Sequence, residues 1–196
     1  MGSRRDLTPD STSVQVYTGR GDVLVDLDTG ERHLLEFLRD QSWGVALDGS
    51  IVTTSLPGVR EWDDGKVVRE TLLGPLENLQ SPIIGDSSIA AARADALSGD
   101  RPARFDVYGL IALDRDSLAT RGFLPVPETG SWYVDSGNLS PVAWLDEDTV
   151  AFTVLPRDAA KEYLLTWDVD TGEISRVSCW PASYSAVFAT DLLGRP

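Results

Sequence analysis

The chain has few residues of the kinds that build reactive or metal-binding sites. Its 196 residues include one cysteine, Cys179, and one histidine, His33. One cysteine excludes an internal disulfide and a cysteine-based metal cluster, and one histidine leaves little room for a zinc enzyme. No G-x-S-x-G motif supplies a nucleophile for His33. We therefore expect no metal, no other cofactor and no catalytic histidine, and we expect Cys179 to be a buried, inert thiol.

Long apolar runs are also missing. Two arginines near the start are not followed by the roughly 7–15 apolar residues of a secretory signal. No segment approaches the roughly 20 apolar residues of a membrane span. We expect a cytoplasmic protein from the sequence as written, and an extracytoplasmic one if a longer parent was truncated. Residues 1–12 are interpreted as a disordered or partial-repeat tail, and residues 13–194 as a single domain.

Basic charge is scarce relative to acidic charge. The chain has 17 Lys and Arg against 31 Asp and Glu, which gives a formal net charge of −14. A surface of this sign repels phosphate backbones and anionic lipids, so we expect no nucleic-acid partner and no membrane insertion. Hydrophobic residues at 42% and charged residues at 24% are typical of a globular protein. The partner expected of this acidic protein is an unidentified protein or small molecule.

Short runs of apolar or β-branched residues, bounded by Gly, Pro, Asp or Ser, follow one another along the chain. Their length and boundaries are typical of strands. The runs are Val14–Tyr17, Val23–Asp26, Trp43–Leu47, Ile51–Thr54, Val59–Trp62, Val67–Leu72, Ile89–Ala92, Phe105–Leu113, Val142–Leu145, Val150–Val154, Tyr163–Trp167 and Ile174–Val177. Helices could form only at Leu34–Asp40 and in the alanine-rich Ile89–Leu97. The sequence therefore predicts an all-β protein.

A strand–turn–strand pattern recurs along the chain. Val23–Glu31 and Leu164–Glu173 match well, and Val59–Lys66 and Gly109–Ser117 are weaker copies. The turns recur at intervals of roughly 35–56 residues, a spacing typical of propeller blades or a similar β array.

The strand candidates divide into four units. Residues 42–74, 80–125 and 139–180 each contain four candidates, whereas residues 13–37 contain three and Tyr184–Asp191 contains one. A ring that completes one blade from both chain ends hides two sheet edges. We therefore predict a β-propeller-like fold of about four blades, closed by N- and C-terminal strands. A fragment of a larger propeller is the alternative architecture, and a sandwich comes third.

Some of these segments resemble known propeller repeats. The sequence Leu165-Thr-Trp-Asp-Val-Asp-Thr-Gly-Glu173 resembles the third strand and turn of WD-repeat propellers. Leu7–Asp10 and Leu139–Pro141 resemble the Ser-Pro-Asp-Gly turn of TolB-like repeats, although in the second segment the acidic turn comes later, at Asp146–Asp148. One unit of four has a good Trp-Asp pair, and the Gly-His pair of WD repeats is missing. The resemblance implies a propeller and assigns no function, because propellers include enzymes, scaffolds and receptors.

Acidic residues gather in the expected turns. Asp26–Glu31 and Asp168–Glu173 have the D-x-D-x-G spacing of a calcium loop, but the twelfth position holds Phe37 or Cys179, neither of which can bind calcium. We interpret both as hairpin turns in which Asp accepts backbone N–H bonds. The carboxylate pairs that a glycosidase would need have the same interpretation. They are Asp63 with Asp64, Asp114 with Asp116, and the run Asp146, Glu147 and Asp148.

The aromatic residues provide the candidate binding surface. Most of the six tryptophans are expected in the core, where large rings fill the space between twisted sheets. Trp132 and Tyr133 follow the loop at Pro125–Gly130, so they are the best candidates for an exposed aromatic binding site.

The sequence favours a non-catalytic binding or scaffolding module that holds a ligand or a protein partner at one loop face. One alternative is an enzyme that acts on a glycan or small molecule through carboxylates near the central channel. Carboxylates with raised pKa values in one pocket would support that alternative, and carboxylates scattered over outer turns would oppose it. Another alternative is a truncated fragment of a larger secreted propeller.

Overall fold

The structure is a computed structural model that describes about two-thirds of the chain. The described residues are 5–7, 13–18, 21–35, 42–45, 50–55, 58–63, 66–72, 77–95, 109–125, 139–156 and 159–182. In these ranges the structure has sixteen strands and no helix, which confirms the all-β prediction. Consistently, these ranges contain no helix with the length and hydropathy that crossing a bilayer would need.

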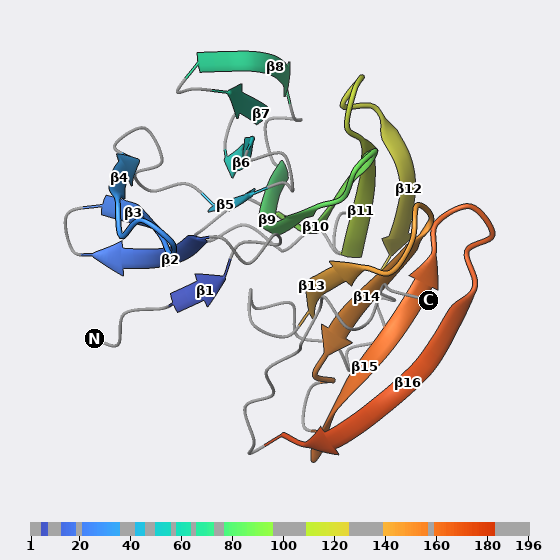
Figure 1. The fold of residues 1–196 in the computed structure, drawn as a ribbon. Coiled ribbons are helices and arrows are strands. Elements are labelled where there is room, and N and C mark those ends of the chain that lie inside the picture. Colours follow the sequence, from blue (N-terminus) through green and yellow to red (C-terminus); the bar gives the residue numbers. More distant parts are fainter. Residues whose placement is uncertain are drawn as a thin grey trace, which may run out of the picture.

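The strands form four antiparallel sheets of four strands each, and every sheet is built from consecutive strands (Figure 1). Sheet 1 contains β1 (Arg5–Leu7), β2 (Ser13–Thr18), β3 (Gly21–Asp26) and β4 (Arg32–Leu35). Sheet 2 contains β5 (Ser42–Val45), β6 (Ile51–Ser55), β7 (Gly58–Asp63) and β8 (Lys66–Leu72). Sheet 3 contains β9 (Glu77–Ile84), β10 (Ser88–Asp95), β11 (Gly109–Asp114) and β12 (Thr120–Pro125). Sheet 4 contains β13 (Leu139–Trp144), β14 (Thr149–Val154), β15 (Lys161–Asp168) and β16 (Ile174–Pro181).

The first strands of sheets 2, 3 and 4 lie next to one another near the centre of the molecule (Figure 1). β9 contacts β5 and β6 of the preceding sheet and β13 of the following one, whereas β8, β12 and β16 lie farthest from the centre (Figure 1). Sheets arranged in this way around a common centre are of the β-propeller type, as predicted.

The first sheet differs from its prediction in one strand. Arg5–Leu7 pairs with Val14–Val16 of β2, so sheet 1 takes its fourth strand from the segment that was interpreted as a tail. Three residues are too short a run to be recognised as a strand from periodicity. Tyr184–Asp191, which was expected to complete this sheet, lies outside the described residues, so closure by the C-terminal strand stays a prediction.

The alanine-rich segment forms a strand and not a helix. Ser88–Asp95 is β10, which lies between β9 and β11 in sheet 3. Its residues Ile89 to Ala92 are at most 4% exposed, because sheets 2 and 4 cover its two faces. Small side chains fit a strand that is packed on both faces, and this packing outweighs the helix propensity of alanine.

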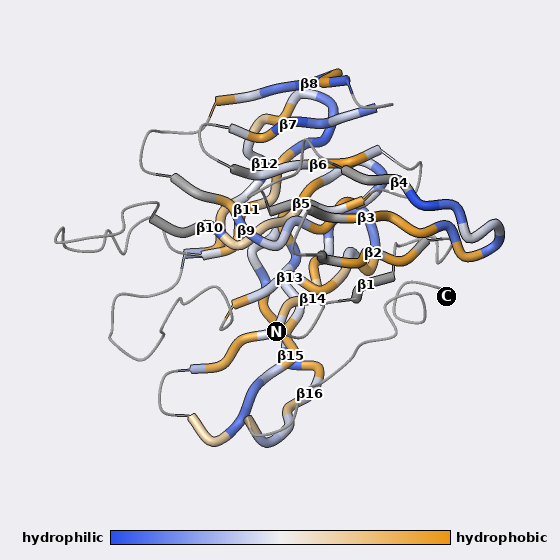
Figure 2. Tube along the Cα trace, turned by 90° about the vertical axis from the view of Figure 1, so that its left-hand side faces the viewer, coloured by the Kyte–Doolittle hydropathy of each residue, from blue (hydrophilic) through white to orange (hydrophobic). Residues whose placement is uncertain are grey.

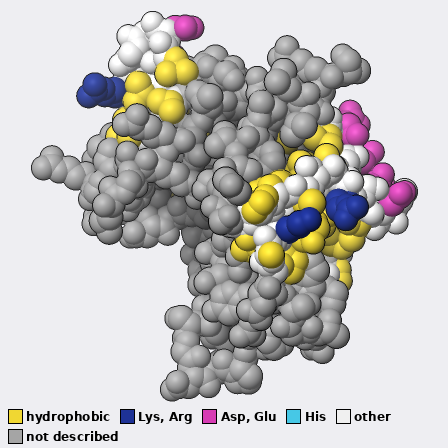
Figure 3. Space-filling model, turned by 90° about the horizontal axis from the view of Figure 1, so that it is seen from below, with side chains coloured by type: hydrophobic (Ala, Val, Ile, Leu, Met, Phe, Trp, Pro, Cys, Tyr) yellow, Lys and Arg dark blue, Asp and Glu magenta, His cyan; other side chains and the backbone are white. Residues whose placement is uncertain are grey.

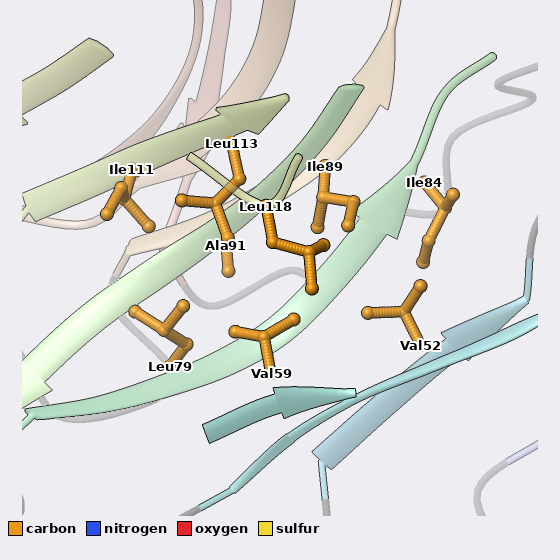
Figure 4. Close-up of a cluster of buried hydrophobic side chains, with 9 residues drawn as sticks. All are labelled: Val52, Val59, Leu79, Ile84, Ile89, Ala91, Ile111, Leu113 and Leu118. Carbon is orange, nitrogen blue, oxygen red and sulfur yellow. The ribbon is translucent and has the colours of Figure 1, made fainter. Parts of the chain in front are cut away.

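Hydrophobic side chains fill the spaces between adjacent sheets. One cluster joins sheets 2 and 3 (Figure 4) and consists of Val52, Val59, Leu79, Ile84, Ile89, Ala91, Ile111, Leu113 and Leu118. A second cluster joins sheets 3 and 4 and consists of Ala90, Leu110, Ala112, Leu139, Val150, Phe152, Val154, Trp167 and Val169. Alternate residues of β10 and β11 belong to the two clusters, as the period of two in a strand requires. Sheet 3 therefore has both faces in the core.

Polar turns and outer strands form the exterior. The turn between β3 and β4 projects from the body and is mainly hydrophilic (Figure 2). The outermost strand of sheet 4, β16, is exposed on both faces from Ile174 to Cys179, and its pairing with β15 shifts register opposite Leu164 and Leu165. Hydrophobic and basic side chains share this part of the surface, with acidic ones at its edge (Figure 3). Cys179 is exposed, so the expectation of a buried thiol was wrong.

The packing of sheets 3 and 4 depends on one glycine. A Cβ atom on Gly122 of β12 would lie 2.8 Å from Val169 Cγ1 and 3.2 Å from Trp167 Cζ2. We expect Gly122→Ala to lower the free energy of unfolding by about 1–3 kcal/mol, measured by urea denaturation, because the core must shift to admit the methyl group. Gly172→Asn is the control and stays close to wild type, because Gly172 (φ +77°) has open space around it and Asn tolerates this conformation. Equal effects of the two substitutions would contradict this account.

Candidate functional site

Three turns between third and fourth strands share one hydrogen-bonding pattern. Each third strand ends in an aspartate whose Oδ1 atom accepts an N–H bond from the residue three positions later. The N–O distances are 2.6 Å from Thr29 to Asp26, 2.7 Å from Ser117 to Asp114, and 2.7 Å from Thr171 to Asp168. This pattern confirms that Asp26–Glu31 and Asp168–Glu173 are hairpin turns.

These hydrogen bonds change the acidity of the turn carboxylates. The hydroxyl and backbone N–H of Ser117 lower the pKa of Asp114, and the N–H and hydroxyl of Thr171 lower the pKa of Asp168. In the turn between β13 and β14, the backbone N–H of Asp148 does the same for the pKa of Asp146, with further bonds from Thr149. Carboxylates with lowered pKa values stay ionised at neutral pH, so these three are not poised to donate a proton.

The fifth residue of each turn adopts a left-handed conformation, but only two of the three are glycines. Gly30 and Gly172 have φ values of 71° and 77°, whereas the equivalent Leu118 has a φ of 56°. This conformation costs a non-glycine residue about 1–2 kcal/mol. Leu118 is 5% exposed in the cluster between sheets 2 and 3, and the burial of its side chain offsets that cost.

A buried ionic cluster joins sheets 2 and 3 close to the β11–β12 turn. Glu61 of β7 is 2% exposed, and its Oε1 atom accepts hydrogen bonds from Nε and Nη2 of Arg115 at 3.0 and 2.7 Å. Ser50 bonds to both partners, at 2.6 Å from Arg115 Nη2 and 3.1 Å from Glu61 Oε1. Arg69 of β8 donates to the second carboxylate oxygen, Oε2, at 2.5 Å. Both oxygens of the buried carboxylate are therefore bound.

A second arginine joins sheets 3 and 4. Arg121 of β12 donates to Asp148 Oδ1 at 2.5 Å and to Asp170 Oδ1 at 3.2 Å. It also bonds to the hydroxyl of Ser88 and to the backbone oxygen of Glu147, at 2.5 and 3.0 Å. The hydrogen bond to Asp148 raises the pKa of Arg121; partial burial opposes this effect, and the bond to Asp170 adds to it.

Neither ionic cluster was predicted from the sequence. A signal exists in the repeat itself, because Arg115 occupies the place that Leu27 and Val169 hold in the other two turns. A charged residue at a place that is apolar in the other copies indicates a specific partner. The sequence does not identify that partner, because Glu61 is 54 positions away from Arg115.

The carboxylates that were considered for catalysis lie in separate turns. Asp114 and Asp116 belong to the β11–β12 turn, and Asp146 to Asp148 belong to the β13–β14 turn. Asp63 ends β7 and is exposed. Among the described residues, no group of three or more His, Cys, Asp or Glu side chains is placed to hold a metal ion.

The tryptophans are distributed between the core and its margins. Trp167 is 2% exposed and packs between sheets 3 and 4, as expected. Trp62, Trp144 and Trp180 are half-buried. Trp62 donates its indole N–H to Thr53, and Trp180 donates to Glu162. His33 lies on β4, but its side chain is outside the described part of the structure.

The candidate binding residues Trp132 and Tyr133 lie outside the described residues, in the segment that joins β12 to β13. That segment, 126–138, leaves from Pro125 and returns at Leu139. Segment 96–108 connects β10 with β11 at the same end of sheet 3, because Gly109 pairs with both Arg93 and Pro125. The Asp turns lie at the opposite end of the sheets. The two longest connections thus start and finish at the end away from both ionic clusters.

Comparisons with known proteins give the fold. No protein-family model and no curated protein matches the chain. Among solved structures, an oligogalacturonate lyase in complex with manganese is 15% identical with a TM-score of 0.50, over 92% of this chain and 55% of that one. A neuraminidase-like protein (A/flat-faced bat/Peru) is 14% identical with a TM-score of 0.47, over 90% and 52% of the two chains.

A putative TolB from Agrobacterium tumefaciens is 12% identical with a TM-score of 0.43, over 91% of this chain and 81% of that one. All three are β-propellers. At 15% identity, the likeness to the lyase shows the fold alone. The chain spans about half the length of the lyase that it matches.

The lowered pKa values predict acid sensitivity. A carboxylate whose pKa is lower in the folded state than in the unfolded state stabilises the fold at pH values above its unfolded-state pKa, which is about 3.9 for Asp. That stabilisation is lost as the pH falls through the folded-state pKa. Wild type should therefore lose stability below about pH 4. In the double variant Asp146→Asn/Asp168→Asn, the amide oxygens still accept the turn hydrogen bonds but the side chains no longer titrate. Its urea midpoint should therefore change less than that of wild type between pH 5 and pH 2. Glu147→Gln removes a charge from the same turn and should follow wild type. Identical profiles for all three proteins would rule out this role of the turns.

The buried ionic cluster predicts a large stability effect. We expect Glu61→Ala to lower the free energy of unfolding by about 3–5 kcal/mol, because Arg115 would then be buried without its carboxylate partner. Glu70→Ala is the control. This substitution breaks the ion pair between Arg60 and Glu70, whose side chains are 26% and 42% exposed. It should lower the free energy of unfolding by less than about 1 kcal/mol. Urea denaturation measures both values, and similar losses in the two variants would contradict the prediction.

Proposed function

We propose that the chain is a non-catalytic binding module of the β-propeller type, which holds a protein partner at the end of the sheets opposite the Asp turns. The observation that carries the proposal is the contrast between the two ends. At the turn end, Asp114, Asp146 and Asp168 bind their own turns, and Arg115 and Arg121 bind carboxylates of neighbouring sheets. At the other end, segment 96–108 joins β10 to β11 and segment 126–138 joins β12 to β13, and these are the two longest stretches of sequence between consecutive strands.

The turn end is suited to a structural role. Asp114, Asp146 and Asp168 each accept hydrogen bonds from their own turn, and these bonds lower their pKa values. Glu61 and Arg121 are committed to partners on neighbouring sheets. Groups that already have partners would have to break those bonds to hold a ligand, which costs free energy. This end therefore supports the framework.

At the opposite end, segment 126–138 is flanked by strands of two sheets that pack against each other. The strands that flank segment 126–138 belong to sheets 3 and 4, which share the second hydrophobic cluster. Connections carried by a rigid scaffold are the usual place for binding residues. Trp and Tyr are the side chains that contribute most often to protein–protein binding energy. We therefore assign Trp132 and Tyr133 to the contact with the partner, and the net charge of −14 favours association with a basic one.

Catalysis on a glycan or small molecule remains the alternative proposal. Glycosidases need two carboxylates at a fixed separation, one of them with a raised pKa. The described carboxylates do not favour this reaction. Asp114 and Asp116 lie in a turn of sheet 3 and Asp146 to Asp148 in a turn of sheet 4, and the carboxylate pKa values that shift are lowered. The comparison with a lyase carries no reaction over to this chain, because it concerns the fold alone.

We further propose that the four sheets are degenerate copies of one WD-like or TolB-like repeat. The supporting observation is the Trp167–Asp168 pair, in which the ring packs between sheets and the carboxylate accepts the turn N–H of Thr171. Asp26 and Asp114 repeat the same turn at the same place in sheets 1 and 3.

The binding proposal is tested with Trp132→Ala/Tyr133→Ala. A partner captured by the wild-type chain from native extract is purified, and its dissociation constant is measured by calorimetry. We expect binding to weaken by about 30- to 1,000-fold, because loss of each central aromatic costs about 1–2 kcal/mol. Leu27→Ala is the control, because Leu27 is 51% exposed in a turn at the other end. It should bind as wild type does.

Two results would contradict the proposal. One is a partner that binds the aromatic double variant as tightly as wild type and the Leu27 variant more weakly. The other is turnover of a uronic-acid glycan such as polygalacturonate by the purified chain, which would favour the enzyme alternative.

A further inference from the structure

One short segment of sheet 3 contacts both neighbouring sheets. Residues 114–121 include the β11–β12 turn and the start of β12. Arg115 and Leu118 of this segment reach sheet 2, and Arg121 reaches sheet 4. Charged and apolar contacts between three sheets thus meet within eight successive residues.

The contacts with sheet 2 are both ionic and apolar. Arg115, 8% exposed, binds Glu61 and Ser50 through its side chain, and its backbone N–H donates to Ser87 at 2.9 Å. Leu118 enters the cluster that contains Val52 and Val59 of sheet 2 (Figure 4). The residues that make the ionic and the apolar contact are three positions apart in the chain, so the conformation of one turn determines both.

The contact with sheet 4 depends on a bulge. Ala112 pairs with Gly122, and Leu113 pairs with Thr120, so Arg121 is an extra residue on β12. A bulge redirects the side chain of its extra residue. Here Arg121 reaches Asp148 and Asp170, and it also bonds to Ser88, the neighbour of the residue that accepts the backbone bond from Arg115.

The conformation of the turn is strained and is held from two sides. Gly30 and Gly172 adopt the same left-handed conformation without a side chain, so they avoid its steric cost. Leu118 adopts it with a full side chain, at a conformational cost. Such a conformation persists where surrounding contacts determine it. The contacts of Asp114 with Ser117, of Arg115 with Glu61 and of Leu118 with the core provide that support.

We infer that residues 114–121 act as one clamp. They couple the packing of sheet 2 against sheet 3 to the packing of sheet 4 against sheet 3. Release of Arg115 from Glu61 removes a support of the turn, and the same turn leads directly into the bulge that aims Arg121 at sheet 4. The reverse holds for release of Arg121. This inference does not depend on the proposed function.

A double-mutant cycle tests the clamp. Arg115→Met and Arg121→Met are measured singly and together by urea denaturation. We expect the double variant to lose less stability than the sum of the two single losses, because the first substitution already loosens the contact that the second removes. The expected coupling is a factor of roughly 2 to 100 in the unfolding equilibrium constant, the range found for sites that act together.

The control cycle pairs Arg121→Met with Arg60→Met. Arg60 forms a surface pair with Glu70 within sheet 2 and has no place in the clamp. The losses in this cycle should add. If the Arg115 and Arg121 losses add as closely as those of the control cycle, the inference is wrong.

Hydrogen exchange of the unaltered protein gives a second measurement that does not depend on any variant folding. Amides of β7 in sheet 2 and β14 in sheet 4 are followed at rising, sub-denaturing urea concentrations. A clamp predicts that both sets converge on one opening event. An opening that exposes the β7 amides while those of β14 stay protected, or the reverse, would overturn the inference.

Discussion

The buried pairing of Glu61 with Arg115 is the interaction on which the other contacts depend. A carboxylate that is 2% exposed loses several kcal/mol of hydration, so it is tolerated only with a partner of opposite charge and good geometry. Arg115 supplies that partner only if its turn takes the conformation that places Leu118 in the core. The ionic contact, the left-handed leucine and the adjacent hydrophobic cluster therefore require one another. A pair of this kind fixes how two sheets fit together more than it adds to their stability.

The local structure followed from the sequence, and the contacts between sheets did not. Period-two runs and Asp turns predicted twelve of the sixteen described strands, because alternation and turn chemistry are properties of neighbouring residues. Arg115 and Arg121 were missed because their partners lie on other sheets, and Arg121 depends on a bulge that no local pattern indicates. Arg5–Leu7 was missed because three residues carry too little periodicity. Trp132 and Tyr133, the candidate site, lie outside the described residues, so that assignment stays a prediction.

The acidic character of the chain has two different physical origins at its turn end. Asp26, Asp114 and Asp168 are required by the turns, where their oxygens replace missing backbone partners. Asp148 and Asp170 bind Arg121, so they serve the junction between two sheets. The surplus of acid is in this respect a product of the repeated architecture. The described turn carboxylates are therefore accounted for by the turns and the sheet junctions that they hold.

The outermost strand of sheet 4 has a consequence for the behaviour of the protein in solution. β16 exposes both faces and bears the hydrophobic side chains of Ile174 and Val177 at 48% and 55% exposure. A flat edge of this composition would recruit strands from other molecules and grow into aggregates. The register shift opposite Leu164 and Leu165 distorts that edge, Arg176 places a charge on it, and Pro181 ends it without an N–H donor. The same irregularities that interrupt the sheet make its edge a poor template for a strand of another molecule.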